Sequence, residues 1–118
     1  MSLTIESITC WLVDIPTIRP HKLSMATMGC QTLTIVRMTC AEGVVGWGEA
    51  TTIGGLSYGA ESPEGIRSAI ETYLAPLLSG QAFSGVAALA EKMNASVKGN
   101  TFAKSALETA FLDAQDNS

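Results

Sequence analysis

The chain has 118 residues, enough for one domain but too few for a barrel of eight strand–helix units, which needs at least about 200 residues. Hydrophobic residues make up 47% of the chain and charged residues only 15%, which indicates a folded globular domain with a small charged fraction. The net charge of −4 and the lack of any basic run argue against nucleic acid and membrane surfaces as partners.

The first half of the chain predicts three strands. Residues 5–15 are rich in β-branched and aromatic side chains, and Pro16 is expected to end this strand. A second strand, residues 22–40, would place Thr32, Thr34, Val36 and Met38 on one face and Leu33, Ile35 and Arg37 on the other. The segment 41–43 (AEG) reads as a hairpin turn, and residues 44–50 form the third strand.

The second half predicts a glycine-rich loop and then three helices. The loop covers about residues 51–61, and Ser62 followed by Pro63 is a strong helix start, because serine caps and proline fits the first helical position. Pro76 is expected to end the regular part of this helix near Leu74. Apolar residues then recur at helical spacing in two more segments.

The second helix is expected to begin at Ser84 and to end at Gly99, and the third to begin at Asn100 or Thr101. The apolar stripe of the third helix is Phe102, Ala103, Ala106, Leu107, Ala110, Phe111 and Ala114. The sequence therefore predicts one α+β domain over 1–118, a three-stranded antiparallel meander (about 3–50), a loop (about 51–61) and three helices (about 62–115).

Motif patterns give no complete catalytic set. Residues 55–59 match G-x-S-x-G, but a nucleophile elbow needs a helix directly after the serine and a later histidine, whereas His21 comes first. The glycine-rich segment 43–48 is not followed by the Lys and Ser/Thr of a phosphate-binding loop. Its glycines instead indicate close backbone packing within a strand. Cys10, Cys30 and Cys40 have no metal-ligand spacing and, with no signal-peptide pattern, predict reduced thiols in a cytoplasmic protein.

Longer stretches carry a resemblance. Residues 14–23 (DIPTIRPHKL), 46–59 (GWGEATTIGGLSYG), 61–66 (ESPEGI) and 98–106 (KGNTFAKSA) resemble the N-terminal part of muconate and chloromuconate cycloisomerases in the enolase superfamily. The G-x-G-E-A segment is shared widely in that superfamily, whereas T-T-I-G-G-x-x-Y with E-S-P-E-G is typical of the muconate branch. The resemblance covers nearly the whole chain.

The resemblance implies a capping domain that covers a catalytic barrel. In these enzymes barrel carboxylates hold manganese or magnesium, and barrel lysines move the proton when cis,cis-muconate and muconolactone interconvert during aromatic-compound catabolism. Two cap loops select the substrate, about residues 17–23 and 51–59. The resemblance assigns His21 to the first loop and Ile53, Gly54 and Tyr58 to the second as substrate-binding residues.

The family's metal ligands and catalytic lysines lie beyond residue 118. We therefore expect this chain to bind no metal, to contain no catalytic residue and to be inactive alone, with the barrel domain as its partner and a small dicarboxylate as substrate. Two alternatives stay open: the cap of a related racemase or epimerase, and a free-standing binding or assembly module. The second would self-associate through the third helix, whose Phe102, Leu107 and Phe111 would need a cover.

Overall fold

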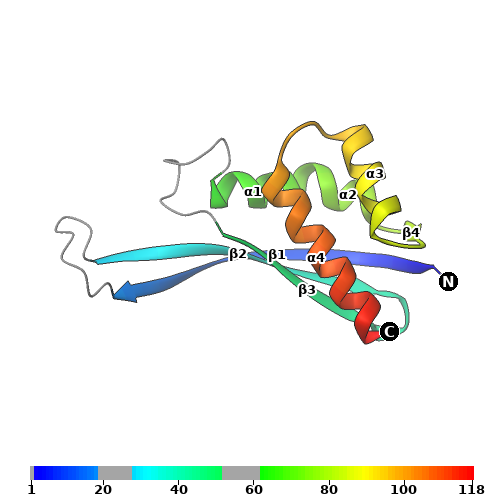
Figure 1. The fold of residues 1–118 in the computed structure, drawn as a ribbon, viewed down its shortest axis with the longest axis horizontal. Coiled ribbons are helices and arrows are strands. Elements are labelled where there is room, and N and C mark those ends of the chain that lie inside the picture. The colour runs from blue at the N-terminus through cyan, green and yellow to red at the C-terminus, as the bar shows by residue number, and fades with distance from the viewer. Residues whose placement is uncertain (1, 19–27, 52–61) are drawn as a thin grey trace.

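A computed structural model of the chain describes residues 2–18, 28–51 and 62–118. Its centre is an antiparallel sheet of four strands in the order β3-β2-β1-β4. The strands are β1 (Leu3–Ile18), β2 (Met28–Cys40), β3 (Val45–Thr51) and β4 (Ala82–Phe83). Figure 1 shows the helices lying over one face of this sheet, with paired β1 and β2 projecting beyond them. The predicted α+β class is confirmed.

Strand β1 is longer than the sequence predicts. It continues through Pro16, which pairs with Cys30, as far as Ile18, which pairs with Met28. The prediction that Pro16 ends the strand is wrong. Its second neighbour, β4, pairs only with Leu3 and Thr4, so among the described residues β1 is an edge at Pro16, where proline is tolerated.

The hairpin between β2 and β3 has the predicted turn. A short 3₁₀ segment, η2 (Ala41–Gly43), separates the strands, and both Glu42 (φ 64°) and Gly43 (φ 77°) take left-handed backbone angles. Glycine has no Cβ to oppose such angles, which explains its place in the turn.

The sequence analysis predicted three strands and did not predict the fourth, β4. β4 contains only Ala82 and Phe83, whose partners in β1 are Thr4 and Leu3. Two residues are too few to show an alternating pattern, so sequence periodicity cannot reveal this strand. It nevertheless extends the sheet past the N-terminal part of β1.

The regular α-helical part of the first helical segment ends before the predicted position near Leu74, and the segment itself continues to Leu78. It consists of α1 (Pro63–Ala69), a π-helical stretch η4 (Ile70–Leu74) and α2 (Ala75–Leu78). Pro76 lacks an N–H and its ring crowds the carbonyl four residues earlier in an ordinary helix. The wider π turn directly before α2 accommodates the proline, so the helix continues.

The last two helices are α3 (Val86–Ser96) and α4 (Thr101–Asn117). The N-cap of α3 is Gly85, so the predicted start at Ser84 is slightly early. Gly99 (φ 65°) and Asn100 (φ 53°) are both left-handed and turn the chain sharply between the helices.

The apolar stripe of α4 packs into the core. Leu107 and Phe111 are fully buried, and Phe111 contacts Phe83 edge to face at 6.3 Å between ring centroids. Of the three residues expected to need a cover, only Phe102 is exposed, at 42%. The premise for self-association through this helix is therefore wrong, because the chain itself covers Leu107 and Phe111.

Candidate functional site

The two predicted substrate loops are flanked by residues at one end of the sheet. β1 and β3 both pair antiparallel with β2, so they run in the same direction. Ile18, Met28 and Thr51, which border the segments 19–27 and 52–61, consequently lie at the same end. The four predicted site residues lie outside the described residues: His21, Ile53, Gly54 and Tyr58.

The sheet gives these two segments different starting points. Thr51 pairs with Leu33, whereas Ile18 pairs with Met28, five positions further along β2. At about 3.3 Å per residue, the segment 19–27 begins about 17 Å further along the strand direction of the sheet than the segment 52–61. The projecting β1–β2 ribbon in Figure 1 is the visible consequence.

The start of α1 is anchored beside the end of β3. The Ser62 hydroxyl accepts a hydrogen bond from the Gly65 N–H at 3.0 Å, which caps the helix as predicted. The buried Thr34 hydroxyl donates to the Pro63 carbonyl at 3.4 Å, and Thr34 pairs with Ala50 in the sheet. Both described ends of the 52–61 segment are therefore held by β2.

The glycines of the GWGEA segment bring β3 directly against α4. A Cβ atom on Gly46 would lie 2.0 Å from the Ala110 carbonyl oxygen, and one on Gly48 would lie 2.2 Å from that of Ala106. Real Cβ atoms do not approach so closely, so only glycine allows this contact. The predicted close backbone packing is confirmed, and its partner is a helix.

The C-terminal turn of α4 also binds the edge strand β3. The Asp113 carboxylate accepts a hydrogen bond from the Trp47 backbone N–H at 2.8 Å, and the Asn117 amide donates to the Val45 carbonyl at 3.0 Å. Both side chains satisfy backbone groups of an edge strand, which otherwise invite other chains to pair. Sequence reasoning missed these roles, although the spacing of four residues places both on one side of the helix.

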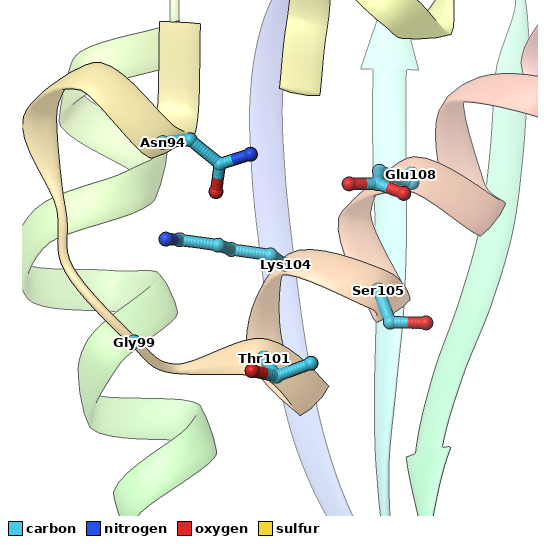
Figure 2. A pocket seen from close by; sticks show the side chains of 6 residues that line it. All are labelled: Asn94, Gly99, Thr101, Lys104, Ser105 and Glu108. Atoms are coloured by element: carbon cyan, nitrogen blue, oxygen red, sulfur yellow. The ribbon is translucent and has the colours of Figure 1, made fainter. Parts of the chain in front are cut away.

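A polar hollow of about 440 Å³ lies where α3 turns into α4 (Figure 2). It is lined by Asn94, Gly99, Thr101, Lys104, Ser105 and Glu108. Lys104 is only 8% exposed, and its Nζ donates a hydrogen bond to the Val97 carbonyl at the C-terminal end of α3. A cation there complements the negative end of the helix dipole, which indicates a structural role for this lysine.

The titratable groups of the described residues do not assemble into a reaction centre. Burial, reinforced by Glu71 and opposed by Arg67, raises the pKa of the Cys10 thiol to about 11, and burial also raises the pKa of Cys40. A thiol with a raised pKa stays protonated and unreactive at neutral pH. Within these residues no three His, Cys, Asp or Glu side chains could hold a metal ion. No described helix is long and apolar enough to cross a membrane.

Comparison with known proteins identifies the family of this chain. Residues 7–118 match the family model described as "Mandelate racemase / muconate lactonizing enzyme, N-terminal domain". The chain is 59% identical to muconate cycloisomerase 1-2 of Acinetobacter lwoffii over 94% of its length and 29% of that protein. Its identity to a chloromuconate cycloisomerase of Cupriavidus necator is 41%, over 94% of the chain and 30% of that protein.

A solved structure shows the same fold. Muconate lactonizing enzyme from Pseudomonas fluorescens, complexed with muconolactone, superimposes with a TM-score of 0.87 at 55% identity, covering 96% of this chain and 30% of that one. The chain thus spans about a third of the length of these relatives. It belongs to the N-terminal domain family of the mandelate racemases and muconate lactonizing enzymes.

Proposed function

We propose that this chain is the substrate-selecting cap of an enzyme that interconverts cis,cis-muconate and muconolactone. The observation that supports the proposal is the position of the described residues that border the two predicted loop segments. Ile18, Met28 and Thr51 lie at the same end of the sheet, as expected for a cap over a barrel mouth. Identities of 53–59% to muconate cycloisomerases of Acinetobacter and Pseudomonas support this class of reaction.

The cap's part in the reaction is binding and exclusion of water. Ile53 and Tyr58 are proposed to contact the substrate, Gly54 to allow close approach, and His21 to reach it from the other segment. Shielding the site strengthens the electrostatic contacts that orient a dicarboxylate. The manganese or magnesium ion would stabilise negative charge on the intermediate. The ligands of this ion are proposed to lie in the barrel, as the family resemblance implies.

The two alternatives have less support. A racemase or epimerase shares the cap family, but the muconate-type loop sequence and these relatives favour lactonisation. A free-standing module based on the third helix loses its premise, because Leu107 and Phe111 are buried within the chain.

A domain exchange tests the proposal. This chain replaces the corresponding N-terminal region of Pseudomonas putida muconate cycloisomerase, with which it shares 55% identity. The chimera is expected to lactonise cis,cis-muconate when manganese is supplied, whereas the isolated 118-residue chain is expected to show no turnover. A well-folded chimera without activity, or turnover by the isolated chain, would contradict the proposal.

Loop substitutions in the chimera then test the residue roles. Tyr58→Phe and Ile53→Ala are expected to raise the KM for muconate about tenfold, because each removes a contact made with the bound substrate. Ser68→Ala serves as the matched control, since Ser68 is exposed on α1 and belongs to neither segment. An unchanged KM in both loop variants would remove these residues from the site.

A further inference from the structure

The core face of β2 carries a buried hydroxyl. Thr34 is fully buried, and its described neighbours on the same face, Val36 and Met38, are apolar. Burying a hydroxyl costs free energy unless it finds a hydrogen-bond partner, whereas valine would suit the same strand position without that need. The hydroxyl at position 34 therefore indicates a specific contact.

The partner of this hydroxyl is the first residue of α1. Thr34 Oγ1 donates a long hydrogen bond to the Pro63 carbonyl, at 3.4 Å. Otherwise α1 packs on the sheet through buried apolar side chains such as Ile66 and Ala69. In the described part of the chain no second hydrogen bond joins α1 to a strand. Apolar contacts have no preferred direction, so the directional Thr34 bond determines where α1 begins along β2.

The same residue also lies beside the end of β3. Backbone pairing places Thr34 opposite Ala50, and β3 ends one residue later, at Thr51. Figure 1 shows the start of α1 above this end of β3. Thr34 therefore contacts both described flanks of the segment 52–61, through its backbone on one side and through its hydroxyl on the other.

We propose that Thr34 is a positioning residue for substrate binding. Its hydroxyl keeps the start of α1 at a fixed place relative to the end of β3, and so fixes the two points between which the segment 52–61 is attached. The inference rests on the proposed function, in which Ile53, Gly54 and Tyr58 of this segment contact the substrate. Thr34 acts through these residues and is itself enclosed in the core.

A loosened attachment should affect binding more than chemistry. When one attachment point can move, the segment has more conformations, and more conformational entropy is lost when substrate binds. Contacts made equally with the bound substrate and the transition state influence KM rather than kcat. Loss of the Thr34 hydroxyl is therefore expected to raise KM, whereas a general loss of folded protein would lower the apparent kcat.

Two matched pairs at position 34 isolate the hydroxyl in the chimera with Pseudomonas putida muconate cycloisomerase. Thr34→Val keeps the branched shape and removes the donor, and Thr34→Ala differs from Thr34→Ser only by the hydroxyl. KM for cis,cis-muconate is expected to be about threefold higher for Thr34→Val than for the parent chimera, and for Thr34→Ala than for Thr34→Ser. Within each pair, kcat is expected to differ by less than about twofold.

Thr39→Val is the matched control for Thr34→Val. Thr39 lies in the same strand, pairs with Val45 at the opposite end of β3, and belongs to the other face of the sheet. The same change of side chain there is expected to leave KM and kcat unchanged.

Hydrogen exchange in the same chimera gives a readout that does not depend on turnover. The Gly65 and Ile66 amides donate to the Ser62 hydroxyl and carbonyl at the start of α1. A peptide containing these amides is expected to exchange at least about threefold faster in Thr34→Val and in Thr34→Ala than in their hydroxyl-bearing matches. A peptide from α3 is expected to exchange at the same rate in all of them.

The outcomes separate this inference from the proposed function. A well-folded parent chimera without activity removes the proposed function, and this inference with it. An active parent chimera whose KM is unchanged in Thr34→Val overturns this inference alone, and so does a rise in KM without faster exchange at the start of α1. An equal rise in Thr39→Val would show a general effect of changes in β2 and also overturn it. If Thr34→Val is unfolded by circular dichroism, the comparison of Thr34→Ala with Thr34→Ser decides.

Discussion

The two faces of strand β3 have opposite compositions. Gly46, Gly48 and Ala50 are buried towards α4, whereas Trp47 and Glu49, the residues between them, are exposed on the other side. The smallest residues lie where a helix backbone approaches, and the largest lies where nothing in the described chain covers the sheet. The G-x-G-E-A pattern thus combines a packing requirement at alternate positions with a separate surface at the others.

This difference indicates that the burial of a residue, rather than the strand it belongs to, determines how much a substitution lowers the free energy of unfolding. The helix-covered face contains a contact so close that no side chain fits, together with fully buried residues such as Phe111 and Met38. On the open face, a change mostly alters contact with solvent. Substitutions on the two faces should therefore separate clearly in their effect on the free energy of unfolding.

The strongest test is Gly46→Val. Atoms of the new side chain would overlap the Ala110 carbonyl and the Ala114 N–H, which are backbone groups that cannot rotate away. We expect a loss of more than about 5 kcal/mol, comparable to the whole stability of a small domain, so the variant should not fold. Circular dichroism and urea unfolding measure this. Gly85→Ala is the control, since nothing lies within 4 Å of its added Cβ.

Phe111→Ala should be nearly as damaging. The ring is fully buried and packs against Phe83, so its removal leaves a cavity in the core. The expected loss is about 3 to 5 kcal/mol by urea unfolding. Leu112→Ala, at a neighbouring position of the same helix that is 47% exposed, should cost far less. Equal effects in the two variants would contradict the assignment of the buried side of α4.

Alkaline pH should reveal the burial of Cys10 on the helix-covered face. Its pKa is raised from 9.0 to about 11 in the folded chain, mainly by burial, so the folded state holds the proton more tightly than the unfolded state. The stabilisation is present below pH 9 and is lost as the pH rises through 11. A two-unit shift corresponds to about 3 kcal/mol. The Cys10→Ala variant should lose less stability across this range, and an identical pH profile would contradict the burial.

Asp113→Asn tests the edge of β3, between the two faces. The carboxylate accepts from the Trp47 N–H at an exposed position, so we expect a loss of about 1 kcal/mol. Hydrogen exchange of the Trp47 amide should become faster. Asp116→Asn, which changes an exposed carboxylate on the same helix, is the control and should leave both measurements unchanged.

Periodicity predicted most of the fold because it reports burial. Of the two faces predicted for β2, the one with Thr34, Val36 and Met38 is buried, and the helical stripe of Leu107 and Phe111 also faces the core. The Ser62 cap and the Gly43 turn were also predicted correctly, because each depends only on residues next to it in the chain. Features without a period were missed, namely the two-residue β4 and the π turn before Pro76.

The candidate site was less accessible to such reasoning. Patterns do not report contacts across long sequence separations, such as Asp113 with Trp47, 66 residues apart, or the stack of Trp11 on Trp47. The substrate residues came from a resemblance, and the composition of 51–61 alone indicated only a glycine-rich loop. His21, Ile53, Gly54 and Tyr58 lie outside the described residues, so their roles stay predictions.

Trp47→Thr should have the smallest effect on folding. Threonine suits a strand, and the lost ring contact with Trp11 is made on an exposed surface. The free energy of unfolding, measured by urea unfolding, should fall by no more than about 1 kcal/mol. A loss as large as that of Phe111→Ala would show that the open face is part of the core, and the contrast between the two faces would fail.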